Sequence, residues 1–128
     1  MVVFENSLEN SLNSKQNGVE YRVFIAMRCW YPRASETIQE VKKFNPNEVI
    51  LLPLYPHYSA ATSGSSLLEW KNLSNKINLN INAKTICCYP EDKKFIKAHS
   101  KLIIEKIKKL KNIKLIFSAH GLPEKNIK

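Results

Sequence analysis

The chain has 128 residues, of which 44% are hydrophobic and 24% are charged, as in an ordinary globular domain. This composition excludes a wholly disordered, collagenous or low-complexity protein, and the length allows one domain or part of one. The formal net charge is +9, carried by 17 lysines and 3 arginines. There is no apolar run of about 18 residues, so we expect no membrane-spanning helix. The first ten residues show no signal peptide.

Nine of the lysines lie between Lys93 and Lys114. A basic balance of this kind is typical of proteins that bind nucleic acid or membranes. Arginine is scarce, however, and no nucleic-acid-binding motif is present, so nucleic acid is not an expected partner. A solvated helix face explains the cluster more simply, and an anionic small-molecule substrate is also compatible with it.

The chain has three cysteines, Cys29, Cys87 and Cys88, and the last two are adjacent. An odd number with two neighbours is no disulfide framework, so we expect three reduced thiols in a reducing compartment. No Cys-x-x-Cys pair exists, and the chain alone is therefore not expected to hold zinc or an iron–sulfur cluster. We expect a cytoplasmic location.

The first expected elements follow a polar segment. Residues 1–20 form that segment, which is a loop or a short helix. The helix is an option because apolar residues recur in the segment at helical spacing. The apolar run at residues 21–27 (YRVFIAM) predicts a buried strand. The spacing of apolar residues then predicts a helix over residues 35–44, which Asn45 and Pro46 end.

Two further strand–helix pairs are expected. Residues 48–54 (EVILLPL) predict a second strand, and a loop of small polar residues, 59–66, leads to a helix over residues 67–77. Residues 83–89 (AKTICCY) predict a third strand. A long helix is expected over residues 91–110, with acids at its beginning and lysines at its end, as the helix dipole favours.

Residues 113–118 (IKLIFS) predict a fourth strand, so that strands and helices alternate along the chain. Each strand is a continuous apolar run, which indicates that both faces of the sheet are covered. The sequence therefore predicts an α/β protein of doubly wound type, with a parallel sheet and helices on both faces. The fourth strand would leave an uncovered edge, so we expect residues 21–128 to be an incomplete domain.

Ligands bind beyond the carboxyl ends of the strands in such sheets. His120 follows the fourth strand there, and a neutral imidazole can bind a metal or accept a proton near neutral pH. Closing the strand by a hydrogen bond to backbone is the alternative role for this histidine, and its position alone does not decide between them. His99 lies on the apolar side of the long helix, where we expect a histidine at the edge of the core.

The segment after the second strand is also a candidate site. The rings of Tyr55 and Tyr58 could stack on a flat ligand, or they could pack against the edge of the sheet. Backbone N–H groups and hydroxyls in residues 62–66 could hold phosphate or carboxylate. Alternatively, Ser65 or Ser66 only caps the following helix.

Arg28 closes the first strand and is followed by Cys29, Trp30 and Tyr31. A guanidinium among aromatic side chains could pair with a carboxylate of the substrate. The alternative is an ordinary surface ion pair.

Three segments, taken together, resemble the ferrochelatase family. They are residues 24–32 (FIAMRCWYP), residues 52–59 (LPLYPHYS) with 62–65 (TSGS), and residues 117–123 (FSAHGLP). Their order and spacing are similar to those of the family along about residues 20 to 125, which is nearly the whole chain.

The resemblance implies two similar α/β domains around a porphyrin cleft, and insertion of Fe²⁺ into protoporphyrin IX to give protohaem, the last step of haem biosynthesis. His120 matches the family's active-site histidine, which binds iron, takes protons from the pyrrole nitrogens, or both. Arg28 matches an arginine that lines the active site, and Tyr55 a tyrosine of the pocket. Tyr58, Ser59 and Thr62 are expected to contact the substrate as well. No permanently bound cofactor is expected, and Fe²⁺ is a substrate.

The sequence departs from the family pattern at several positions. Cys29 stands where many relatives carry Tyr, and His57 where Gln is more usual. Ala60 stands where animal enzymes place an iron–sulfur cysteine, so no cluster is expected. A leading segment and a second domain with a catalytic glutamate are not in this sequence. We therefore expect little or no chelatase activity from the isolated chain.

The departures leave several interpretations open. The chain is a split or decayed gene product, or one piece of a complementing pair. A partner chain that supplies the missing half, and loose association with a membrane, are both left open. One alternative function is a non-catalytic, flavodoxin-like module that binds phosphate or flavin through residues 62–66. Another is an interaction fragment that docks through its edge strand.

Overall fold

The structure is a computed structural model of the chain, and it describes residues 2–15, 17–119 and 121. Two compact units are present. The first comprises Met1–Val49 and Leu68–Asn82, and the second comprises Ile50–Leu67 and Ala83–Lys128. The boundary that the sequence predicts at residue 20 stays a prediction.

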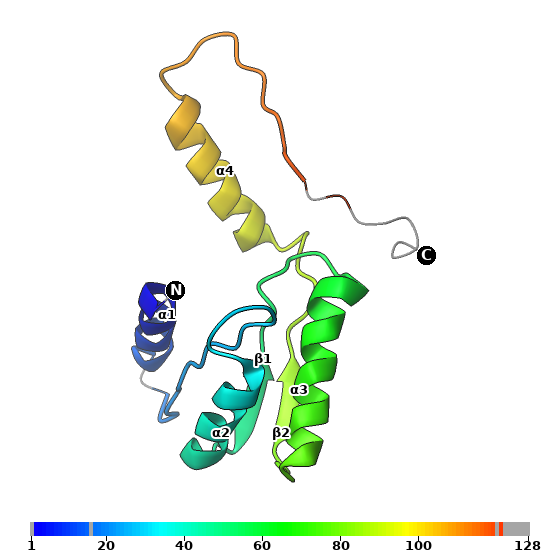
Figure 1. Cartoon of the computed structure of the whole chain (residues 1–128). Helices are drawn as coiled ribbons and strands as arrows, with labels where there is room; N and C mark the ends of the chain where they lie inside the picture. Colours follow the sequence, from blue (N-terminus) through cyan, green and yellow to red (C-terminus); the bar gives the residue numbers. More distant parts are fainter. Residues whose placement is uncertain (1, 16, 120, 122–128) are drawn as a thin grey trace. The chain divides into compact units, whose positions relative to one another are not determined.

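The described residues form helices and a small sheet (Figure 1). In chain order the elements are α1 (Val2–Asn13), α2 (Ala34–Phe44), β1 (Glu48–Leu51), the π-helical turn η1 (Ala60–Gly64), α3 (Ser65–Lys76), β2 (Asn82–Thr85) and α4 (Lys93–Ile107). β1 and β2 pair in parallel, and α3 lies between them in the chain, as in a βαβ crossover. The α/β class is therefore confirmed, and all the expected helices are present.

The buried apolar side chains lie on α2. Its buried residues recur at intervals of three and four along the helix: Ala34, Thr37, Ile38 and Val41. This spacing places them on one face, as the sequence predicts for a helix that covers a core. The ring of Phe44, at the end of the helix, contacts the ring of Phe24 edge-on, with 5.9 Å between the ring centroids. The core of the first unit is thus a single helix face.

Local hydrogen bonds fix both ends of α2. The backbone N–H of Arg33 donates to the carboxylate of Glu36 at 2.8 Å, as in a capping box. At the other end, Asn45 adopts a left-handed conformation with φ 53°, and its N–H donates to the carbonyl oxygen of Val41. Asparagine tolerates this conformation better than most residues do. The predicted end of the helix before Pro46 is therefore confirmed.

Residues 21–27 are not a strand, contrary to the prediction. The backbone groups that a neighbouring strand would bind are taken by side chains of the helices instead. The N–H of Val23 donates to Glu9 at 2.8 Å, and the carbonyl oxygen of Ile25 accepts from the Thr37 hydroxyl at 2.6 Å. Outside the named strands, the described residues form one isolated bridge, between Met27 and Arg33.

Residues 113–118 also differ from the prediction, because they form neither a strand nor part of a core. Ile116 is 85% exposed and Phe117 is 78% exposed. A buried strand requires a partner that binds its backbone and a layer that covers its side chains. The sheet has two strands, and every residue of β2 is exposed, so the expected four-stranded sheet with covered faces is wrong for this structure.

Asp92 caps the beginning of α4, because its carboxylate accepts hydrogen bonds from the N–H groups of Lys94 and Phe95 at 3.0 and 2.8 Å. The rings of Tyr89 and Phe95 meet edge-on, and His99 lies against Phe95 with 4.3 Å between the ring centroids. His99 is exposed, so the expected position at the edge of a core is wrong.

None of the described helices combines the length and the apolar character needed to cross a membrane.

Candidate functional site

Ser59 organises the turn that follows the Tyr55–Tyr58 segment. Its hydroxyl accepts a hydrogen bond from the N–H of Ala61 at 3.2 Å, as an N-cap side chain does. Its carbonyl oxygen accepts from the N–H groups of Thr62 and Gly64 at 3.1 and 3.0 Å. Ser59 itself is buried. Ser59 is therefore the N-cap of the π-helical turn η1, which continues directly into α3.

The alternative that Ser65 or Ser66 caps the beginning of the following helix is therefore wrong. These two hydroxyls act as donors and not as caps. The Ser65 hydroxyl donates to the carbonyl oxygens of Ala61 and Thr62, and the Ser66 hydroxyl donates to that of Thr62. The reason is that the helical conformation already begins at residue 60, so both serines lie inside the helix and bond back to the preceding turn.

Thr62 is half-buried in the same turn, and its hydroxyl lies 3.4 Å from the carbonyl oxygen of Ser59. The N–H groups of Thr62 and Gly64 donate within the turn, as described above. The side chain of Ser63 is fully buried, and its hydroxyl has no hydrogen-bond partner among the described residues. Most of the polar groups expected to hold an anion are thus engaged in the turn itself.

The two tyrosine rings are accessible. Tyr55 is 48% exposed and Tyr58 is 61% exposed, so neither ring is buried as packing at the edge of the sheet. A Cβ atom added at Gly64 would lie 2.8 Å from the Tyr58 hydroxyl, which means that the hydroxyl approaches the turn where a side chain is lacking. The arrangement favours the interpretation that both rings can meet a flat ligand.

Arg28 forms an ion pair, as in the alternative interpretation of its role. Its guanidinium lies 3.6 Å from the carboxylate of Glu69 on α3. The loop that carries it is closed by a 2.8 Å hydrogen bond from the N–H of Met27 to the carbonyl oxygen of Pro32. Arg28 is exposed and Glu69 is half-buried, so the pair is partly solvated and contributes little to stability. Glu69 could not be predicted as the partner of Arg28 from the sequence, because no local pattern links the two residues.

The predicted site residues that the structure describes are divided between the two units. Arg28 lies in the first unit, and Tyr55, Tyr58, Ser59 and Thr62 lie in the second. His120 lies outside the described residues. Within the described ranges no group of three or more His, Cys, Asp or Glu side chains could hold a metal ion. The roles given to these six residues therefore stay predictions.

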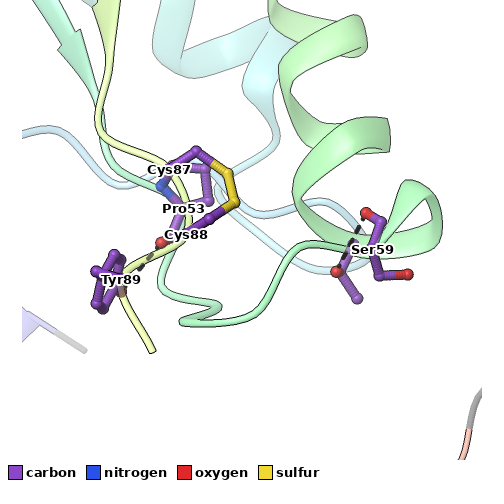
Figure 2. The surroundings of a disulfide bond; sticks show 6 residues. Pro53, Ser59, Cys87, Cys88 and Tyr89 are labelled. Atoms are coloured by element: carbon purple, nitrogen blue, oxygen red, sulfur yellow. Dashed lines mark hydrogen bonds between the residues drawn. A yellow bond between two sulfur atoms is a disulfide. The ribbon is translucent and has the colours of Figure 1, made fainter. Parts of the chain in front are cut away.

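The two adjacent cysteines differ from the prediction of reduced thiols. Cys87 and Cys88 are joined by a disulfide bond just after β2 (Figure 2). The odd number of cysteines did not exclude this bond, because one thiol, that of Cys29, stays free. Cys29 is a free, exposed thiol, as expected. The adjacency of the two residues was interpreted as evidence against a disulfide, and the structure contradicts that interpretation.

The fold and the candidate residues together define an α/β protein with an aromatic, hydroxyl-bearing segment at the end of a parallel strand. The ferrochelatase family model matches residues 3–128. This chain therefore belongs to the ferrochelatase family.

Individual relatives agree with the family match. The chain is 62% identical over 122 residues to a ferrochelatase of Pelagibacter ubique, a match that covers 95% of this chain and 36% of the relative. It is 52% identical to a ferrochelatase of Rickettsia bellii, over 84% of this chain and 29% of the relative. A ferrochelatase of Phenylobacterium zucineum is 45% identical, over 93% of this chain and 35% of that protein. The chain thus spans about a third of the length of these relatives.

Proposed function

We propose that this chain takes part in the ferrochelatase reaction, the insertion of Fe²⁺ into protoporphyrin IX to give protohaem. The observation that carries the proposal is the match to the ferrochelatase family over residues 3–128. A relative that is 62% identical and is named a ferrochelatase supports it. The family match also favours this function over a flavodoxin-like binding module, for which residues 62–66 were the expected anion site.

The chemistry assigns a role to each candidate residue. Two pyrrole N–H protons must leave the porphyrin as the metal enters, and the neutral imidazole of His120 can accept a proton or bind Fe²⁺. The exposed rings of Tyr55 and Tyr58 offer flat apolar surface to the macrocycle. The Arg28 guanidinium exchanges Glu69 for a propionate of the porphyrin, since both partners are carboxylates.

In this proposal Ser59 acts on the substrate indirectly, and Thr62 contacts it. Because Ser59 is buried and caps η1, it holds the turn that follows the tyrosines, and it acts on the porphyrin through that turn. Thr62 is half-buried, and its 3.4 Å contact with the Ser59 carbonyl oxygen is long for a hydroxyl donor. The Thr62 hydroxyl can therefore turn toward a polar group of the substrate.

We further propose that the reaction uses no resident cofactor and no iron–sulfur cluster, and that it takes place in the cytoplasm.

The isolated chain is inactive in this proposal, because it spans about a third of the length of its relatives. Activity then requires the parts of a ferrochelatase that this sequence does not contain, supplied by a partner chain. Loose association with a membrane would bring the chain to its poorly soluble porphyrin substrate.

An anaerobic assay of the purified chain with Fe²⁺ or Zn²⁺ and protoporphyrin IX tests the proposal. We expect no turnover by the chain alone. We expect turnover when a polypeptide with the remaining residues of the Pelagibacter ubique ferrochelatase is added. The His120→Ala variant should abolish that turnover. Restored activity that survives His120→Ala would contradict the role of the histidine, and turnover by the chain alone would contradict its inactivity.

A further inference from the structure

The cysteine pair after β2 has no role in the proposed function. We propose that Cys87 and Cys88 form a reversible thiol–disulfide site that reacts with low-molecular-weight thiols and their disulfides. The bond joins residues that are adjacent in sequence, so its formation needs no folding of a distant segment. Cys88 is exposed and Cys87 is half-buried, so a small thiol can reach the bond. In a reducing compartment, disulfides within proteins are mostly of this transient kind.

The reaction is a two-electron exchange. The thiolate of the small thiol attacks one sulfur of the Cys87–Cys88 bond, forms a mixed disulfide and releases the other cysteine as a thiolate, which takes a proton from water. A second small thiolate then attacks the mixed disulfide and releases the first cysteine. The products are two protein thiols and one small-molecule disulfide. The protein pair is reduced, and the two small thiols are oxidised by the same two electrons.

The site lies between two contacts that tie residues 86–89 to the end of β1 and to the residues just after it. The N–H of Ile86 donates to the carbonyl oxygen of Leu51 at 2.9 Å, and the Tyr89 hydroxyl donates to that of Pro53 at 3.1 Å. Figure 2 shows the second of these contacts beside the disulfide. Pro53 lies two residues before Tyr55, so this hydrogen bond holds the beginning of the segment that carries both candidate tyrosines.

The backbone at Cys88 couples the redox state to the Tyr89 contact. Its φ is 67°, in the left-handed region that residues with a Cβ atom seldom adopt. While the disulfide exists, the short ring through both side chains restricts the backbone there. Once the bond is reduced, Cys88 is free to return to the extended conformation, in which successive side chains point to opposite faces. Tyr89 then turns away from Pro53, and the Tyr55 segment loses that support.

Thiol counting on the full chain tests the redox site. After equilibration with a small disulfide we expect Cys87 and Cys88 to resist alkylation, with Cys29 present as a thiol or as a mixed disulfide with the small molecule, and after equilibration with an excess of the small thiol we expect all three cysteines to be alkylatable. Peptide mass spectrometry should find the peptide with Cys87 and Cys88 lighter by two hydrogen atoms in the oxidised sample. The Cys29→Ser variant should behave identically at this pair. The proposal is overturned if both cysteines stay alkylatable, stay capped as mixed disulfides, or bond to Cys29 under oxidising conditions.

Hydrogen exchange tests the coupling to the Pro53 segment. We expect amides of residues 54–62 to exchange several-fold faster in the reduced chain and in the Cys87→Ser/Cys88→Ser variant than in the oxidised chain. Tyr89→Phe, which retains both cysteines, should exchange fast in both redox states. Thiol counts on this variant should still show the exchange reaction. Identical protection of residues 54–62 in the oxidised and reduced chains would overturn the coupling, while the thiol counts would still decide the redox site.

Discussion

The hydroxyl of Thr37, on the buried face of α2, donates a 2.6 Å hydrogen bond to the backbone carbonyl oxygen of Ile25. Thr37 is buried and Ile25 is half-buried, so water competes less for this carbonyl than for one on the surface. The bond gives residues 21–27 a partner that a neighbouring strand would otherwise provide. It also explains why a polar residue lies in the row of buried residues on α2.

Replacing Thr37 by Val tests that bond, because valine has nearly the same shape and no hydroxyl. We expect a loss of about 1 kcal/mol in the free energy of unfolding, since the carbonyl of the half-buried Ile25 loses its donor. Urea unfolding followed by circular dichroism measures this loss. Thr37→Ser is the matched control, because it keeps the donor and lacks only a methyl group. A Val variant as stable as the Ser variant would show that the hydrogen bond contributes nothing.

A second prediction concerns the packing of the same helix face. Ile38 is fully buried, and Ile38→Ala should lower the free energy of unfolding by about 2–5 kcal/mol through lost burial and a cavity. Ile96 on α4 is 49% exposed, so Ile96→Ala should change the free energy by no more than about 0.5 kcal/mol. Both values come from urea unfolding of the two variants. Equal effects would mean that the core is not on α2.

The helices of this chain could be predicted from the sequence because their signals are local. The spacing of Ile38 and Val41 indicates which face of α2 is buried, and Asp92 marks the beginning of α4. A strand depends on a partner that is distant in sequence, and the apolar run at residues 113–118 says nothing about whether that partner is present. The prediction of four strands therefore failed where it relied on composition alone, at residues 21–27 and 113–118.

A third prediction concerns the cap of η1. Ser59→Ala removes the acceptor for the N–H of Ala61 and should lower the free energy of unfolding by about 1 kcal/mol. Ser66→Ala is the matched control, because its hydroxyl only donates to the carbonyl oxygen of Thr62 and caps nothing. We expect the control to change stability by no more than about 0.5 kcal/mol. Thermal unfolding of both variants decides the matter, and a larger effect at Ser66 would refute the assignment of the cap.

The position of the candidate site in the chain could be predicted from the sequence, but the hydrogen bonds and ion pairs of its residues could not. The family motif around Tyr55 and Ser59 identified a segment that does follow a strand and lead into a helix. Which serine caps the helix depends on where the helical conformation begins, and that is set by η1, a turn with no sequence signature of its own. The Arg28–Glu69 pair joins two elements far apart in the chain, so the sequence indicated only the type of contact and not its partner.

That pair allows the structural and substrate roles of Arg28 to be separated. The pair is long and partly solvated, so Arg28→Gln and Glu69→Gln should each change the free energy of unfolding by no more than about 1 kcal/mol. If the guanidinium binds a propionate of the porphyrin, Arg28→Gln should weaken protoporphyrin IX binding about tenfold, the effect of one charged hydrogen bond. Glu69→Gln should leave binding unchanged or tighten it, because it removes the competing carboxylate.

Titration of protoporphyrin IX fluorescence against each variant measures this binding, and urea unfolding of the same samples measures stability. Equal weakening by Arg28→Gln and Glu69→Gln would mean that the ion pair supports the loop and that the guanidinium does not contact the porphyrin. Weakening by Arg28→Gln alone, at unchanged stability, places the charge of Arg28 on the substrate. The Glu69 variant thus separates two roles that the Arg28 substitution by itself would confound, because both roles predict some loss of binding when the guanidinium is removed.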